Sequence, residues 1–133
     1  MEDIYRKQGM FSWNELMTTD VEAAKLFYNR LLGWEFQTLE SPEMTYYIVK
    51  ANGKEVGGIM ALPEEAKGAP PMWGSCVTVD DVDKLVGETE TLGGKVLVPP
   101  RDIPDVGRFA VIQDNQGAAL TLITYLEKPG SAS

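Results

Sequence analysis

The sequence predicts an α+β fold, in which two paired βαβββ modules form one curved mixed sheet around a cleft, with the helices outside. The chain of 133 residues has the length of one domain. One order of segments, a strand followed by a helix and three strands, occurs twice along it. A shift of 61 residues aligns the two copies, placing Asp20 on Asp81 and Leu31 on Leu92.

The first copy opens with residues 11–18, whose alternating pattern predicts a strand. Thr19 to Glu22 has the S/T-x-x-E pattern of a capping box, so we expect Thr19 to cap the helix that follows. Gly33 is expected to end this helix. The apolar side chains spaced to share one face of the helix are Val21, Ala24, Phe27, Tyr28, Leu31 and Leu32. The strands expected next are residues 34–39, 45–51 and 55–62, the last two joined by an Asn52-Gly53 hairpin turn.

The second copy follows a polar, proline-rich connector. Asp80 and Asp83 mark the start of its helix, which we expect to close at Gly93 and Gly94. Residues 99–109 read as a proline-rich loop, either a rim over the cleft or a stiff surface connector. Its strands are expected at 72–79, 95–98, 107–113 and 118–125. The expected organisation is an N-terminal extension (1–9), module 1 (10–62), a linker (63–71), module 2 (72–126) and a flexible tail (127–133).

Composition limits the classes of partner. The chain carries 20 acidic and 12 basic residues, a net charge of −8, which would repel nucleic acid and anionic membrane surfaces. No stretch has the length of a membrane span, and the N-terminal residues lack the apolar core of a signal peptide. Cys76 is the only cysteine, which excludes an internal disulfide and suits a reducing compartment. We expect a cytoplasmic protein.

The sequence contains no histidine. This excludes Ser-His-Asp and Cys-His nucleophile systems, the two-histidine iron triad and histidine-bound zinc. A single cysteine cannot build a thiolate zinc site either. What remains is chemistry by carboxylate, tyrosine, lysine or backbone groups, a hard cation held by oxygen ligands, or binding without chemistry.

Two segments carry a resemblance to a known family: TTDVEAAKLFYNRLLGWEF and GGKVLVPPRDIPDVGRFAVIQDNQGA. Together with the paired modules they resemble the vicinal oxygen chelate superfamily, which includes glyoxalase I, bleomycin-resistance proteins, fosfomycin-resistance enzymes and extradiol dioxygenases. The resemblance extends over about residues 10–125. It implies the fold described above, a homodimer and a metal site in the cleft, although this fold supports many different activities.

The resemblance places metal ligands on the first and last strands of each module. Carried onto this sequence, the positions are Trp13 and Gly74 on the first strands and Met60 and Thr121 on the last. The 61-residue shift gives the same two pairs, because it places Trp13 on Gly74 and Met60 on Thr121. None of the four is a usual ligand of zinc, nickel or iron(II). We therefore expect neither a catalytic metal nor another cofactor.

Glu15 is the one ionisable side chain that the first strand would turn into the cleft, between Trp13 and Met17. Burial there would raise its pKa unless a cation paired with it. The candidate cations are Arg108, Lys50 and Lys54. The sequence leaves three roles open for Glu15: an acid/base group, a clamp for an amine or hydroxyl of a ligand, or a structural carboxylate bonded to a tyrosine or backbone of a neighbouring strand.

The predicted ligand-binding set is Trp13, Glu15, Met17, Tyr46, Tyr47, Met60, Arg108, Phe109 and Thr121. Tyr46 and Tyr47 point to opposite faces of one strand, so only one of them can face the cleft. Arg108 is a candidate to hold an anionic group. Cys76 lies in mid-strand and is expected to be a small buried side chain.

Three hypotheses follow. The one we favour is a metal-free small-molecule-binding protein with an aromatic cleft and Glu15 as its polar anchor. The second is a lyase, isomerase or dioxygenase with an altered metal site or with Glu15 as acid/base. The third is an interaction module whose cleft is filled. The sequence does not identify the ligand.

Overall fold

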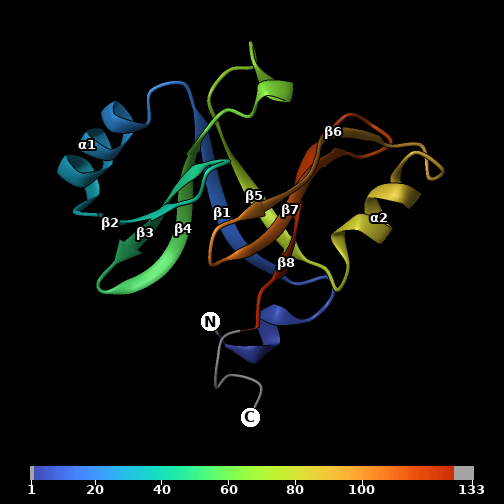
Figure 1. The fold of residues 1–133 in the computed structure, drawn as a ribbon, viewed down its shortest axis with the longest axis horizontal. Helices are drawn as coiled ribbons and strands as arrows, with labels where there is room; N and C mark the ends of the chain where they lie inside the picture. The colour runs from blue at the N-terminus through green and yellow to red at the C-terminus, as the bar shows by residue number, and fades with distance from the viewer. Residues whose placement is uncertain (1, 128–133) are drawn as a thin grey trace.

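The computed structural model of the chain describes residues 2–127, and within them eight strands form one sheet (Figure 1). The strand order is β2-β3-β4-β1-β5-β8-β7-β6, so each module supplies four adjacent strands. At the centre, the first strands of the modules, β1 and β5, pair antiparallel, whereas β1 with β4 and β5 with β8 pair parallel. The predicted α+β fold with a mixed sheet of two βαβββ modules is confirmed.

The strands are β1 (Phe11–Thr18), β2 (Glu35–Glu40), β3 (Thr45–Ala51), β4 (Lys54–Ala61), β5 (Met72–Thr78), β6 (Lys95–Ile103), β7 (Gly107–Gln113) and β8 (Ala119–Tyr125). The helices are α1 (Val21–Leu32) and α2 (Val82–Thr89), with short 3-10 turns η1 (Asp3–Arg6) and η2 (Glu64–Ala66). Neither α1 nor α2 is long and apolar enough to cross a membrane, nor is any other helix in residues 2–127. Most of the expected tail, residues 128–133, lies outside the described residues.

The two helices start one residue later than the sequence pattern suggested. Asp20, not Thr19, caps α1, with its side chain accepting a hydrogen bond from the Ala23 backbone N–H at 3.0 Å. Asp81 caps α2 in the same way through Lys84. The expectation of a Thr19 cap was wrong. Asp20, the next residue, has the extended backbone angles of a cap, and its side chain accepts from a backbone N–H that has no partner within the helix.

The expected loop at 99–109 is largely strand, so that prediction was wrong. β6 continues through Pro99 and Pro100 to Ile103. β6 lies at the edge of the sheet, where the missing N–H of a proline costs no hydrogen bond to a neighbouring strand. Its pairing with β7 shifts in register between Val98 and Arg101, the segment that contains the two prolines. Only a short turn therefore separates β6 from β7.

The sheet separates two layers of buried side chains, and both helices pack on the same face. Under α1 lie Leu16, Val49 and Ile59, and under α2 lie Val79, Val82, Ala110 and Leu122. The opposite face carries the main core: Trp13, Met17, Tyr46, Ile48, Met60, Cys76, Val98, Ile103, Phe109 and Ile123. This second face holds the candidate site.

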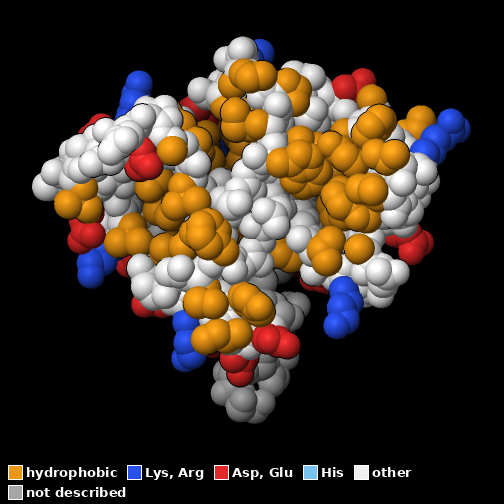
Figure 2. Space-filling view, turned by 180° about the vertical axis from the view of Figure 1, so that it is seen from behind, with side chains coloured by type: hydrophobic (Ala, Val, Ile, Leu, Met, Phe, Trp, Pro, Cys, Tyr) orange, Lys and Arg blue, Asp and Glu red, His pale blue; other side chains and the backbone are white. Residues whose placement is uncertain are grey.

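The apolar stripe expected on α1 is only partly buried. Val21, Ala24 and Tyr28 pack against the sheet as expected. Phe27, Leu31 and Leu32 are each more than half exposed, and so is the neighbouring Leu26. Figure 2 shows that hydrophobic side chains gather in patches on the surface seen from behind.

Candidate functional site

A chain of hydrogen bonds joins Trp13, Tyr46 and Glu15 on the face opposite the helices. The Trp13 indole N–H donates to the Tyr46 hydroxyl at 2.9 Å, and that hydroxyl donates to Glu15 Oε2 at 2.7 Å. An indole N–H can only donate, so the single hydroxyl proton of Tyr46 must point at Glu15. Oε2 is thus an acceptor, and the proton of a neutral Glu15 must sit on Oε1.

Gly58 makes room for this arrangement. It lies directly across from Glu15 in the β1–β4 pair. A Cβ atom at this position would lie 1.8 Å from the hydroxyl oxygen of Tyr46, inside any allowed contact. The absence of a side chain at Gly58 therefore allows the tyrosine to reach the carboxylate.

Glu15 is almost completely buried, with 1% of its surface exposed. Burial raises its pKa from 4.5 to about 7, even though the hydrogen bond from Tyr46 acts in the opposite direction. Its second oxygen, Oε1, has no hydrogen-bond partner among the described residues. None of the expected cations, Arg108, Lys50 or Lys54, forms an ion pair with Glu15 in that part of the chain.

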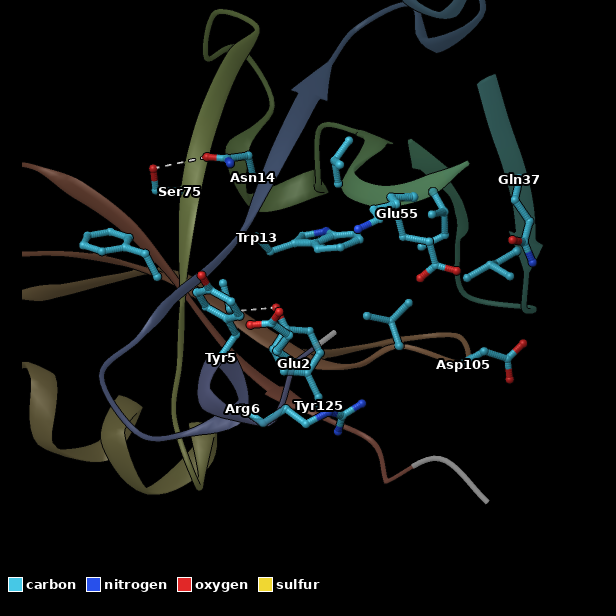
Figure 3. A pocket seen from close by; sticks show the side chains of 17 residues that line it. Glu2, Tyr5, Arg6, Trp13, Asn14, Gln37, Glu55, Ser75, Asp105 and Tyr125 are labelled. Atoms are coloured by element: carbon cyan, nitrogen blue, oxygen red, sulfur yellow. Dashed lines mark hydrogen bonds between the residues drawn. The ribbon is translucent and has the colours of Figure 1, made fainter. Parts of the chain in front are cut away.

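Two cavities flank the chain of hydrogen bonds. The larger, of about 990 Å³, is open and is lined by Trp13 (Figure 3). Its other apolar walls include Leu39, Ile48, Val106 and Tyr125. In Figure 3 the Trp13 indole points toward Glu55 and Gln37, and Tyr125 and Arg6 are seen below it. We call it the large cavity.

The smaller cavity has a volume of about 80 Å³ and is lined by Glu15 itself. Met17, Gly74 and Thr121 contribute further wall. We call it the small cavity. Because Tyr46 bonds both Trp13 and Glu15, the two cavities share one set of hydrogen-bonded side chains.

Most of the predicted ligand-binding residues lie on the expected face. Trp13 lines the large cavity, and Met17 and Thr121 line the small one beside Glu15. Tyr46 is the tyrosine that faces inward. Two further members of the predicted set, Met60 and Phe109, are buried in the core and line neither cavity.

Tyr47 and Arg108 lie on the opposite face. Of the two tyrosines left open by the sequence, Tyr47 is the one that faces away from the cleft, and the placement of Arg108 in the cleft was wrong. Tyr47 packs beneath α1, with the Lys25 ammonium 4.0 Å from its ring centroid. Arg108 bonds Asp83 at 2.8 and 3.1 Å and Asp102 at 3.0 Å, and its hydrogen bond lowers the pKa of Asp83. Arg108 precedes the inward-facing Phe109 on β7, so strand alternation already required it to face outward.

Several residues that line the large cavity were not predicted from the sequence. Ile48 and Tyr125 could have been predicted by strand alternation, because they lie two residues beyond Tyr46 and Ile123 on their strands. Arg6 could not be inferred, since it belongs to the N-terminal extension. Its guanidinium reaches the backbone carbonyl of Leu126 at 3.2 Å.

The side chains at the positions implied for a metal do not suit one. Strand pairing places Thr121 opposite Cys76, and the matching position in module 1, opposite Glu15, is Gly58 rather than Met60. The 61-residue shift is thus two residues short at the last strands, but glycine offers no side-chain ligand either. Within residues 2–127 no three His, Cys, Asp or Glu side chains group so as to hold a metal ion. Indole, thioether and a single hydroxyl do not make a site for zinc, nickel or iron(II).

Cys76 is fully buried, as expected for a small core side chain. Burial, followed by the negative charge of Glu15, raises the pKa of its thiol. A thiol held in its neutral form is a poor nucleophile. The structure therefore offers Glu15, not Cys76, for polar chemistry.

Comparison with known families agrees with the fold. The model of the Glyoxalase/Bleomycin resistance protein/Dioxygenase superfamily matches residues 11–122. The chain belongs to this superfamily. It is 40% identical over 119 residues to CFP32 of Mycobacterium tuberculosis, a protein provisionally named a glyoxylase, covering 87% of this chain and 46% of the relative. It is 31% identical over 127 residues to the anthracycline biosynthesis protein DnrV of Streptomyces peucetius, covering 86% of this chain and 46% of the relative. The chain thus spans about half the length of the curated relatives it matches.

Solved structures with the same fold include methylmalonyl-CoA epimerases. The enzyme from Mycobacterium tuberculosis superposes with a TM-score of 0.61 at 15% identity, covering 95% of each chain. An epimerase of Streptomyces coelicolor gives a TM-score of 0.61 at 19% identity, covering 92% of this chain and 100% of the other. At such identities the likeness shows the fold alone.

Proposed function

We propose that this superfamily member binds a small, mainly apolar organic molecule in the large cavity, without a metal ion. The observation that carries the proposal is an open cavity of about 990 Å³ beside the indole of Trp13. Ligand sites in proteins typically measure about 300–1,000 Å³ and have apolar or aromatic walls with a few polar groups. An interaction module with a filled cleft would not leave this space open.

The wall chemistry favours a flat, aromatic ligand. Trp13 and Tyr125 are two of the aromatic side chains that line it. The charged side chains of the lining are Arg6, Lys54, Glu2, Glu55 and Asp105. Two relatives are named for anthracycline biosynthesis, and anthracyclines are flat, multi-ring molecules. Anthraquinone-2-sulfonate, a planar tricyclic compound that its sulfonate group makes soluble in water, is therefore a suitable probe.

The test measures binding of this probe by thermal shift and by quenching of tryptophan fluorescence, with EDTA present throughout. A ligand at a hundred times its Kd adds about 2.7 kcal/mol to the unfolding free energy, which is readily detected. Leu39→Trp should block the large cavity and abolish binding, while Thr38→Trp, at an exposed position on the other face of β2, should not. Binding that needs an added divalent metal, or that survives Leu39→Trp with unchanged Kd, would overturn the proposal.

A second candidate function is catalysis by Glu15 as a general acid/base. The specific observation in its favour is a pKa of about 7, at which both protonation states are populated near neutral pH. A lyase or isomerase acting on an apolar substrate would fit this chemistry. Loss of turnover in Glu15→Gln with unchanged ligand affinity would support catalysis, and an unchanged rate would exclude a role for Glu15 in it.

We also propose that a second copy of the chain covers the exposed apolar side of α1. Leu31 is 63% exposed there, beside Phe27, and the ring of Phe27 packs edge-on against Tyr28 of an aromatic cluster. Contiguous apolar surface of this kind marks an interaction site. Light scattering should show a dimer that Leu31→Glu dissociates, whereas Leu92→Glu, at the equivalent exposed leucine of module 2, should leave it intact. A monomeric wild-type chain, or equal effects of both changes, would contradict this.

A further inference from the structure

The small cavity is lined by a residue that has an unpartnered polar atom. Glu15 is 1% exposed, lines this cavity and leaves Oε1 without a hydrogen-bond partner among the described residues. A buried polar atom without a partner raises the free energy of the folded state. A ligand that reaches Oε1 and supplies the missing partner would recover that free energy.

The remaining wall limits the kind of ligand. A volume of about 80 Å³ is only a few times the ~30 Å³ that one water molecule takes up in the liquid. Apart from the Thr121 hydroxyl and the Glu15 carboxyl, the lining side chains are apolar: Met17, Met72, Trp73, Val111, Ala119 and Leu120. A suitable ligand group is therefore short and apolar, with one polar end facing Glu15.

We propose that the small cavity binds a short primary alkylammonium group, whose N–H donates to Glu15 Oε1 and whose alkyl chain packs against Met17 and Met72. The site is separate from the large cavity, and the proposal does not depend on what occupies that cavity. It holds for a free alkylamine and for an aminoalkyl arm of a larger molecule, since the chemistry of recognition is the same.

The hydrogen-bond directions favour a cation over a neutral group. Tyr46 already donates to Oε2, so an ionised Glu15 carries its uncompensated charge at Oε1. No lysine or arginine of residues 2–127 pairs with it. An ammonium ion supplies a hydrogen bond and an opposite charge together, and such charge-assisted bonds are about twice as strong as neutral ones.

Binding should depend on pH through Glu15 alone. The other titratable groups that act on it are Tyr46 on β3, Cys76 on β5 and Tyr125 on β8. Burial raises the pKa of all three, so they stay neutral from pH 5 to 8. A primary alkylamine stays protonated up to about pH 10, by analogy with lysine. Amine affinity therefore follows the ionised fraction of the Glu15 carboxyl.

The experiment titrates n-propylamine hydrochloride into the protein and follows backbone amide shifts by NMR, with potassium chloride at equal ionic strength as the salt control. The ionised fraction of a carboxyl with a pKa of about 7 rises roughly tenfold from pH 6 to pH 8, so the Kd should fall about tenfold. 1-Propanol, a neutral donor of the same length, should bind at least about tenfold more weakly at pH 8.

Two variants localise the effect. Glu15→Gln should abolish amine binding. Gly74→Val should abolish it by filling the cavity with Glu15 intact. The Cβ has room, since it meets nothing closer than 3.9 Å, and circular dichroism of the variant checks that the two further methyl groups leave the fold unchanged. Thr45→Val, at an exposed position on β3, should bind as the wild type does.

Three results would overturn the proposal: equal affinity for propanol, binding that tightens toward low pH, or amine binding that survives Glu15→Gln and Gly74→Val. Tightening at low pH would mean that the amine does not bind through the ionised carboxylate of Glu15. Binding of anthraquinone-2-sulfonate should be unchanged in Gly74→Val, so failure here is distinct from failure of the function proposed for the large cavity.

Discussion

Replacing Glu15 by glutamine should change how the stability of the fold depends on pH. Burial raises the pKa of this carboxyl from 4.5 to about 7. The folded state then holds the proton more tightly than the unfolded state does. The stabilisation from the neutral carboxyl is therefore complete below about pH 4.5 and is lost as the pH rises through 7.

The size of the effect follows from the shift. A change from 4.5 to about 7, at ~1.36 kcal/mol per pKa unit, corresponds to about 3 kcal/mol. Most of it, roughly 2–3 kcal/mol, falls between pH 5 and pH 8. The glutamine variant carries no ionisable group at this position, so its stability relative to the wild type should rise by that amount over this range.

Urea unfolding followed by circular dichroism at pH 5, 6, 7 and 8 measures the difference directly. Glu88→Gln, which removes the same charge from an exposed position on α2, is the matched control and should show a constant difference from the wild type. A flat difference for Glu15→Gln would refute the raised pKa. If the stability of Glu15→Gln relative to the wild type rose toward low pH instead, the ionised carboxylate of Glu15 would be the form that the fold stabilises.

Three further changes test the local structure. Gly58→Ala should destabilise the fold by at least about 2 kcal/mol in urea unfolding, because its Cβ would collide with the Tyr46 hydroxyl; a neutral result would contradict that contact. Asp20→Ala should lower the free energy of unfolding by about 1 kcal/mol, and Thr19→Ala should lower it much less. The reverse order would show that Thr19 caps the helix, as the capping-box pattern predicted. Cys76 should react with a thiol reagent only as fast as the chain unfolds, measured by absorbance, so rapid labelling of the folded protein would show that the thiol is accessible.

The fold could be predicted because its signals are local and occur twice. Strand alternation, the glycine at the end of α1 and the Asn52-Gly53 turn each specify backbone geometry within a few residues, and the repeat supplies the pairing of modules. Local sequence pattern failed to predict the structure where the position of a segment in the sheet determines it. The prolines of β6 are tolerated because β6 lies at the sheet edge.

The candidate site was predictable to the extent that alternation along a strand applies. It placed Trp13 and Glu15 on one face and, followed consistently, would have placed Arg108 on the other. Which of the two adjacent tyrosines faces inward depends on the register of β3. Tyr46 can reach Glu15 because Gly58, on another strand, has no side chain in its way. The empty space beside Trp13 depends on side chains from five or more segments, so no local pattern encodes it.

The most direct test of the central claim, metal-independent ligand binding at the large cavity, is NMR of the tryptophan indoles. The chain contains three tryptophans, so three indole N–H signals report separately on Trp13, Trp34 and Trp73. With anthraquinone-2-sulfonate and EDTA present, the Trp13 signal should shift most, because its ring lines the large cavity. An unmoved Trp13 signal, or a shift that appears only after a divalent metal is added, would contradict the account.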